Sequence, residues 1–253
     1  MQTNRREFLI HASAGIALAA MPTALAVKQT ARNRWRAVAF DAFVIFDPRP
    51  AFALTESLFP DRGGELNALW KTRLFEYTWL RTLSGKYADF PSVMTDALAY
   101  AAKSLKIDLK PGQKKDLLDS FFSLKSWPDA LPALRQLQGM SIKLGLLSDF
   151  SAAMLAANLK SSGLDGCFDH VLSTDRVKAF KPDPRAYQMG IDAFKLKRAE
   201  IVFAAFGAWD AAGAKSFGYN TFWVNRLGTV EEELGTPVDA TGEMSGLVEF
   251  VSK

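Results

Sequence analysis

Two short segments, far apart in the chain, carry side chains that suit a nucleophilic reaction. The apolar run Arg36-Ala-Val-Ala-Phe-Asp41 ends on a carboxylate, and Lys181-Pro-Asp-Pro-Arg-Ala-Tyr187 lies far downstream. A carboxylate can act as a nucleophile, and a nearby lysine favours its ionised form. The first segment has the composition of a buried parallel strand, whose carboxyl end is where open α/β folds bind ligands. The pair predicts covalent catalysis by Asp41, with capping of a strand end as the structural alternative.

Polar side chains also follow two later strand-like segments. Ser148 and Asp149 come directly after one of them, and Asp210 lies just beyond another. Because the carboxyl ends of parallel strands meet at one edge of the sheet, we expect these groups to gather near the aspartate and the lysine. The order of these motifs is more specific than any one of them alone.

The elements that must position these residues alternate between strand-like and helix-like after residue 35. Such alternation favours a parallel sheet covered by helices on both faces. We therefore predict a Rossmann-like α/β core over residues 36–50 and 125–253. The expected strands are Ala37–Phe40, Lys143–Leu147, His170–Ser173, Ile201–Phe206 and Thr221–Val224. The expected helices lie near Leu131–Leu137, Met154–Ser162, Pro184–Phe194, Trp209–Phe217 and Glu231–Leu234.

Residues 51–124 break this alternation, because they show helical patterns and no convincing strand. The clearest pattern runs from Glu65 to Leu83, with apolar residues broadly at helical spacing. The segment is inserted after the first strand, so we expect it to form a helical cap subdomain over the ligand edge of the sheet. Most of its aromatic side chains are expected to form the core of the cap.

The first 26 residues have the pattern of an export signal. Asn4-Arg5-Arg6-Glu7-Phe8-Leu9 precedes the mostly apolar Ile10–Ala20 and then Ala24-Leu25-Ala26, a small-residue cleavage site. The adjacent arginines resemble those of a twin-arginine signal. We expect a periplasmic protein with no stable membrane anchor, because the apolar run is shorter than the ~20 residues of a spanning helix. The alternative is a basic N-terminus beside an alanine-rich helix.

Composition excludes several function classes. The net charge is only +4 and the basic residues are scattered, which disfavours binding to nucleic acid. Cys167 is the single cysteine, so the chain can form neither an internal disulfide nor a cysteine-rich zinc site. With His11 inside the export pattern, His170 is the one histidine of the mature chain. A serine–histidine triad and a histidine metal centre are therefore improbable.

The motifs together resemble the haloacid dehalogenase superfamily, and closest in pattern is its type II branch, the L-2-haloacid dehalogenases. The resemblance covers nearly the whole chain from residue 36 onward. Besides the strand-end residues, it rests on Glu76-Tyr-Thr-Trp-Leu-Arg81, Lys181-Pro-Asp-Pro-Arg-Ala-Tyr187, Ala208-Trp-Asp-Ala-Ala-Gly-Ala214 and Thr221-Phe-Trp-Val-Asn-Arg226.

The resemblance implies hydrolysis of small 2-haloacids to 2-hydroxy acids through an aspartyl ester. Asp41 would displace the halide, and water would then cleave the ester at the Asp41 carbonyl. Lys181 would stabilise the Asp41 carboxylate, with Tyr187 as its support. Asp210 would position or activate the water. Ser148, with adjacent backbone N–H groups, would bind the substrate carboxylate.

Several site positions depart from the pattern of that branch. Lys71 stands where the cap helix normally carries an arginine for the halide or substrate, and it lacks the planar guanidinium fork. Arg49 is a second hypothesis for this role. Asp149 and Gly207 each replace an asparagine, and the loop after Asp41 is one residue shorter and lacks the glycine and threonine. The residues expected to bind substrate are Phe43, Lys71, Phe75, Phe90, Asp149, Tyr187, Gly207 and Trp209, with core packing as the alternative for Phe43, Phe75, Phe90 and Trp209.

Three further questions stay open. Magnesium-dependent phosphatases of the superfamily carry acidic residues where this chain has Phe43 and Ala205, so we expect no metal or other cofactor and disfavour phosphate-ester hydrolysis. Another hydrolase acting on an activated small molecule, or a catalytically weakened periplasmic binding protein, is the alternative function. The family often forms homodimers, and the aromatic-rich Phe75–Leu83 segment fits either a dimer contact or packing inside the cap.

Overall fold

The computed structural model of the protein describes residues 34–253, and its centre is a six-stranded parallel sheet. The strand order is β3-β2-β1-β4-β5-β6, so the order reverses at β1, which pairs with β2 on one side and β4 on the other. Open α/β sheets bind ligands at the carboxyl end of such a reversal point. The strands are β1 (Ala37–Phe40), β2 (Lys143–Ser148), β3 (His170–Ser173), β4 (Ile201–Ala205), β5 (Asn220–Val224) and β6 (Ala240–Gly242).

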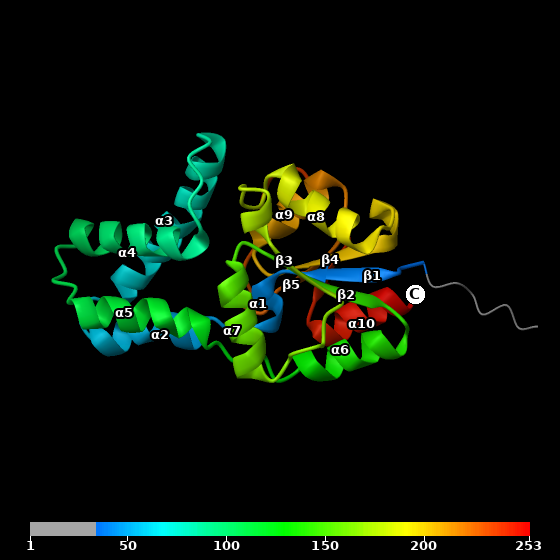
Figure 1. Ribbon diagram of the computed structural model, residues 1–253, viewed down its shortest axis with the longest axis horizontal. Coiled ribbons are helices and arrows are strands. Elements are labelled where there is room, and N and C mark those ends of the chain that lie inside the picture. The colour runs from blue at the N-terminus through cyan, green and yellow to red at the C-terminus, as the bar shows by residue number, and fades with distance from the viewer. Residues whose placement is uncertain (1–33) are drawn as a thin grey trace, which may run out of the picture. The chain divides into compact units, whose positions relative to one another are not determined.

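Helices cover both faces of this sheet (Figure 1). Successive residues of β1 point to opposite faces: Val38 and Phe40 belong to one buried cluster, and Ala37 and Ala39 to the other. The first cluster includes residues of α6, α7 and α10, and the second includes residues of α8 and α9. The bounds are α6 (Ala130–Gly139), α7 (Ala152–Ser162), α8 (Pro184–Phe194), α9 (Ala208–Phe217) and α10 (Met244–Ser252).

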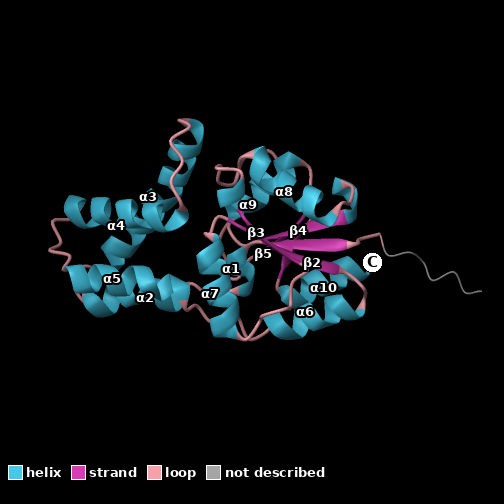
Figure 2. Ribbon diagram, viewed as in Figure 1, coloured by secondary structure: helices cyan, strands magenta, loops and turns pink. Residues whose placement is uncertain are grey.

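The chain between β1 and β2 is helical, and this part of the described structure contains no strand (Figure 2). Its longest helix, α3, packs against α2 and α4, and the indole N–H of Trp70 donates to the Met94 carbonyl at 3.0 Å. We call α2 to α5 the helical insertion; that it acts as a separate cap subdomain stays a prediction. The bounds are α1 (Ala42–Ile45), α2 (Arg49–Leu58), α3 (Gly63–Leu83), α4 (Phe90–Ser104) and α5 (Pro111–Asp119), followed by the 3₁₀ turn Ser120–Phe122.

All five expected strands are present, and four of the five expected core helices are confirmed. The prediction of a helix at Glu231–Leu234 is wrong, because this segment is an exposed loop. Val230 and Leu234 are among the most exposed large apolar side chains. They bury little of their surface, so packing does not stabilise so short a helix. The short elements α1, β6 and α10 were not expected. Within residues 34–253, none of the helices has the length and apolar character needed to cross a bilayer.

Candidate active site

Asp41 lies where β1 ends and α1 begins, at the reversal point of the sheet. Its backbone N–H donates to the Ala204 carbonyl of β4 at 2.9 Å. Its side-chain Oδ2 accepts from the Phe43 N–H at 2.9 Å, so Asp41 is also the N-cap of α1. The shortened loop therefore forms a helical turn, and a backbone N–H bonds the flank of Asp41 where the family pattern has a threonine hydroxyl that this chain lacks.

Lys181 lies between two carboxylates in the buried floor of the site. Its Nζ donates to Asp41 Oδ1 at 2.7 Å and to Asp210 Oδ2 at 2.6 Å. Burial alone would lower the pKa of Lys181, but the carboxylates of Asp210, Asp41 and Asp149 outweigh it and hold the pKa above the usual lysine value. The ammonium group therefore stays charged, and its hydrogen bond fixes the orientation of the Asp41 carboxylate.

Tyr187 supports this arrangement through a different partner from the one that we expected. It is fully buried on α8, and its hydroxyl donates to Asp210 Oδ1 at 2.7 Å. Among the described residues it forms no hydrogen bond to Lys181, and, unlike the other residues expected to bind substrate, it does not line the cavity beside Asp41. Burial has the largest effect and, with the charge of Asp41, keeps the pKa of Asp210 above the usual aspartate value, although Lys181 and the Tyr187 hydroxyl lower it. We refer to four residues as the nucleophile network: Asp41, Lys181, Tyr187 and Asp210.

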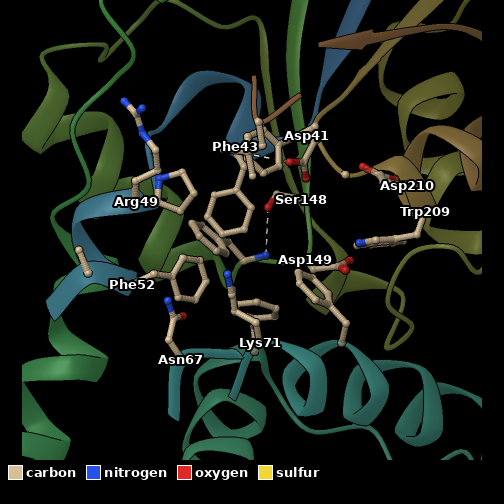
Figure 3. Close-up of a pocket in the computed structure, with 18 of the residues that line it drawn as sticks. Asp41, Phe43, Arg49, Phe52, Asn67, Lys71, Ser148, Asp149, Trp209 and Asp210 are labelled. Carbon is tan, nitrogen blue, oxygen red and sulfur yellow. Dashed lines mark hydrogen bonds between the residues drawn. The ribbon is translucent and has the colours of Figure 1, made fainter. Parts of the chain in front are cut away.

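A cavity of about 390 Å³ opens beside Asp41, between the strand ends and the helical insertion (Figure 3). All the other residues expected to bind substrate line it, as do Asp41, Ser148 and Asp210. Six phenylalanines and one tryptophan contribute to its lining. The ring centroid of Phe43 lies 5.2 Å from that of Phe150 and 5.6 Å from that of Phe206. The residues that reasoning from the sequence missed are Pro48, Phe52, Ala53, Glu56, Asn67, Phe150, Phe206 and Leu227.

The two candidate cations point in different directions. Figure 3 shows the Lys71 side chain directed into the cavity, where its Nζ lies 5.2 Å from the ring centroid of Phe52. The Arg49 guanidinium points away from Asp41 and Ser148; it lies 2.7 Å from Asp47 and stacks 4.4 Å above the Trp127 ring centroid. Of the two, Lys71 is therefore the cation that a ligand in the cavity would meet.

Several polar groups that line the cavity have atoms that are not used in hydrogen bonds within the described residues. Ser148 Oγ accepts from the Phe150 N–H at 3.1 Å, which leaves its hydroxyl proton available. Asp149 Oδ2 and Asn67 Oδ1 are buried and have no hydrogen-bond partner among the described residues. Asn67 precedes Lys71 by four residues, so helical spacing alone could have revealed it. We refer to three residues as the open group: Asn67, Lys71 and Asp149.

Comparison with known proteins agrees with this geometry. Residues 22–218 match the family described as haloacid dehalogenase-like hydrolases. The chain belongs to this family. The haloacid dehalogenase-like chain is 38% identical to the (S)-2-haloacid dehalogenase of Pseudomonas sp. (strain YL), over 81% of this chain and 88% of the relative.

Solved structures similar to this haloacid dehalogenase-like chain include L-2-haloacid dehalogenases. A crystal structure of an L-2-haloacid dehalogenase matches with a TM-score of 0.84 and 40% identity, covering 87% of this chain and 99% of that one. The L-2-haloacid dehalogenase of Xanthobacter autotrophicus with chloropropionic acid covalently bound matches with a TM-score of 0.78 and 30% identity. That match covers 86% of this chain and 98% of the other.

Proposed function

We propose that the protein hydrolyses the carbon–halogen bond of small 2-haloacids and releases halide and a 2-hydroxy acid. The observation that carries the proposal is the Asp41 carboxylate, held 2.7 Å from the Lys181 ammonium at the edge of an aromatic-lined cavity. A carboxylate can displace halide directly, because this leaving group needs no proton. The similarity to (S)-2-haloacid dehalogenases, one of them with chloropropionic acid covalently bound, supports the same chemistry.

The reaction proceeds in two steps on Asp41. A carboxylate oxygen attacks the halogen-bearing carbon, the carbon–halogen bond breaks, and an ester joins the substrate to Asp41. Water then adds to the Asp41 carbonyl carbon, and the hydroxy acid leaves with the original aspartate oxygen. The water gives up both of its protons: one ends on the oxygen of the departing hydroxy acid and the other is released. Asp210, bonded to Lys181 and Tyr187, is the carboxylate placed to orient the water or take its first proton.

The cavity offers polar contacts to one part of the substrate and apolar contacts to the other. The Ser148 hydroxyl and nearby backbone N–H groups suit the carboxylate of a 2-haloacid. Lys71 brings a positive charge from α3 toward the carboxylate or the departing halide. The aromatic rings of Phe75 and Trp209, with centroids 5.2 Å apart, suit the carbon chain and exclude water from the reacting centre.

The same residues do not fit the Mg²⁺ ion of the related phosphatases. The inner oxygens of Asp41 and Asp210 are both taken by the Lys181 ammonium, which would oppose a cation between them. The flanking positions carry Phe43 and Ala205, which offer no oxygen ligand. In the described part of the chain, no group of three or more His, Cys, Asp or Glu side chains is arranged to hold a metal ion.

We further propose that residues 1–26 direct export to the periplasm by a twin-arginine route; they lie outside the described residues. The proposal is supported by Arg5-Arg6 ahead of a short apolar run. Replacing both arginines with lysine should leave the protein inside the cytoplasm. Cell fractionation of the two forms, followed by N-terminal sequencing of the exported one, tests this, and equal export of both would contradict it.

The activity is tested by halide release from racemic 2-chloropropionate, with and without Mg²⁺. We expect metal-independent release by the native protein and at least about a 10⁴-fold loss in Asp41→Asn, because the nucleophile is removed. In a single turnover in ¹⁸O-labelled water, the label should enter Asp41 and not the hydroxy acid. Absence of release by a folded native protein would instead favour the binding-protein alternative.

A further inference from the structure

Asp149 is a buried carboxyl group on the cavity with one oxygen left without a partner. Its Oδ1 accepts from the backbone N–H of Lys181 at 3.0 Å and lies 3.2 Å from the hydroxyl of Thr174. Its Oδ2 is buried and has no hydrogen-bond partner among the described residues. An ionised carboxylate oxygen in such a place would lose its water without gaining a donor, which is costly. The arrangement suits a neutral carboxylic acid with its proton on Oδ2.

The charged groups around Asp149 point the same way. Burial is the largest effect and raises the pKa of Asp149 to about 7. Lys181 opposes this shift by charge and by its backbone hydrogen bond, whereas Asp210 and Asp41 add to it. Because Lys181 already contacts both of those carboxylates, an ionised Asp149 would be a third negative charge around one ammonium group.

The other titratable groups near Asp149 do not place a positive charge beside its carboxyl group that would offset its ionisation. Burial raises the pKa values of Tyr187 and Tyr87, so both tyrosines are neutral near pH 7. Asp175 accepts a hydrogen bond from the Tyr87 hydroxyl. Lys71 faces the same cavity from α3, and Figure 3 shows the Asp149 carboxyl on the side of the cavity that carries Trp209.

We propose that Asp149 binds the 2-haloacid as a neutral carboxylic acid and donates its Oδ2 proton to the substrate carboxylate. The proposal rests on the function proposed above and adds a proton to its binding step. The substrate carboxylate can only accept hydrogen bonds, and Oδ2 is a buried oxygen with nothing else to donate to. Wherever free Asp149 is ionised, substrate binding takes up one proton from the solvent.

The kinetic consequence is a KM that rises with pH. For a group with a pKa of about 7 that must be protonated, KM for 2-chloropropionate should rise roughly thirtyfold between pH 6 and pH 8.5. Asp149→Asn keeps an N–H donor at every pH, so its KM should change by less than about threefold over that range. Asp175→Asn is the matched control: it also replaces a carboxyl with an amide nearby, but off the cavity, and should retain the rise.

Calorimetry on the native protein tests the proton directly and needs no variant to fold. Propionate is the probe, because it has the carboxylate but no leaving group. At pH 8, titrations in two buffers of different ionisation enthalpy should show close to one proton taken up per propionate bound, and close to zero at pH 5.5. Turnover of 2-chloropropionate with a flat KM and no proton uptake would overturn the role of Asp149 and leave the dehalogenase function standing. Absence of both turnover and propionate binding would instead overturn the proposed function.

Discussion

The nucleophile network and the open group belong to the same site but differ in how fully their polar atoms are paired. In the nucleophile network, Lys181 bonds both carboxylates at 2.6–2.7 Å and Tyr187 fixes the far side of Asp210. In the open group, one oxygen of Asn67 and one of Asp149 are buried and unpaired. The first set is therefore organised before substrate arrives, and the second is not.

The difference separates chemistry from recognition. Catalytic groups act best when their dipoles and charges need no reorganisation during the reaction, which a fully bonded set provides. Buried polar atoms without partners cost free energy unless a ligand supplies the missing bond. We therefore expect changes in the nucleophile network to affect turnover and folding, and changes in the open group to affect KM and its pH dependence.

The largest expected effect comes from removing the shared cation. Lys181→Met leaves Asp41 and Asp210 buried without their counter-charge, so unfolding free energy should fall by about 3–5 kcal/mol and halide release should be lost. Urea denaturation and a halide assay measure the two effects. Lys215→Met is the control, because Lys215 pairs with Asp239 at the partly exposed surface and should cost less than about 1 kcal/mol. Equal losses in the two variants would contradict the special status of the network.

Asp149→Asn should change the pH dependence of stability. The folded-state pKa of Asp149 is raised above that of the unfolded chain, so the stability that the protonated form contributes is lost as pH rises through about 7. The variant cannot ionise there, and its unfolding free energy relative to the native protein should increase by about 2–4 kcal/mol between pH 4 and pH 8. Urea titrations across this range measure the trend. A constant difference would mean that Asp149 is not shifted by burial.

Tyr187→Phe should remove one hydrogen bond from the nucleophile network and leave the others in place. Asp210 Oδ1 loses the donor that lies 2.7 Å away, which should cost about 1.5–3 kcal/mol and lower kcat about tenfold or more, with KM little changed. Steady-state kinetics separate the two constants. Tyr219→Phe removes an equally buried hydroxyl, bonded to the Tyr187 carbonyl rather than to a carboxylate, and should lower stability while sparing kcat. A rise in KM with kcat unchanged would place Tyr187 with substrate binding after all.

Reasoning from the sequence predicted the fold better than it predicted the pairing inside the site. The strands Ala37–Phe40 and His170–Ser173 and the helix Pro184–Phe194 have the expected bounds, because apolar composition, capping residues and proline are local signals. The failure at Glu231–Leu234 has the opposite cause: a local helical pattern without any surface to pack against. Tertiary contact, which the pattern does not contain, decided that segment.

Within the site, residue type and order predicted that Asp41, Ser148 and the second carboxylate would meet at one sheet edge. They could not predict which partner each polar atom finds. That the hydroxyl of Tyr187 bonds Asp210 depends on how α8 and α9 pack, and that Asp149 Oδ2 has no donor depends on every element around it. Such facts need coordinates, because hydrogen bonds are set by distances of a few tenths of an ångström.

Variants of Lys71 test whether the open group contributes to substrate binding. Lys71→Met removes the cation that faces the cavity, and kcat/KM for 2-chloropropionate should fall about tenfold through the loss of roughly 1.4 kcal/mol of attraction for the anion. Lys71→Arg keeps the charge and presents its donors as a planar fork, so it should retain or improve kcat/KM. Equal activity of the methionine and arginine variants would show that the charge at this position is not used.

Arg49 lines the cavity but lies outside the open group, and the smallest effect is expected there. Although Arg49 lines the cavity, 61% of its side chain is exposed and its guanidinium is held by Asp47 and the Trp127 ring. Exposed, locally paired charges contribute little, so Arg49→Ala should change kcat/KM by less than about twofold. Measured beside Lys71→Met on the same substrate, it compares two cations at one cavity that differ in direction. A loss as large as that of Lys71→Met would mean that the guanidinium leaves Asp47 to reach the substrate, and recognition would then extend from α3 to the start of α2.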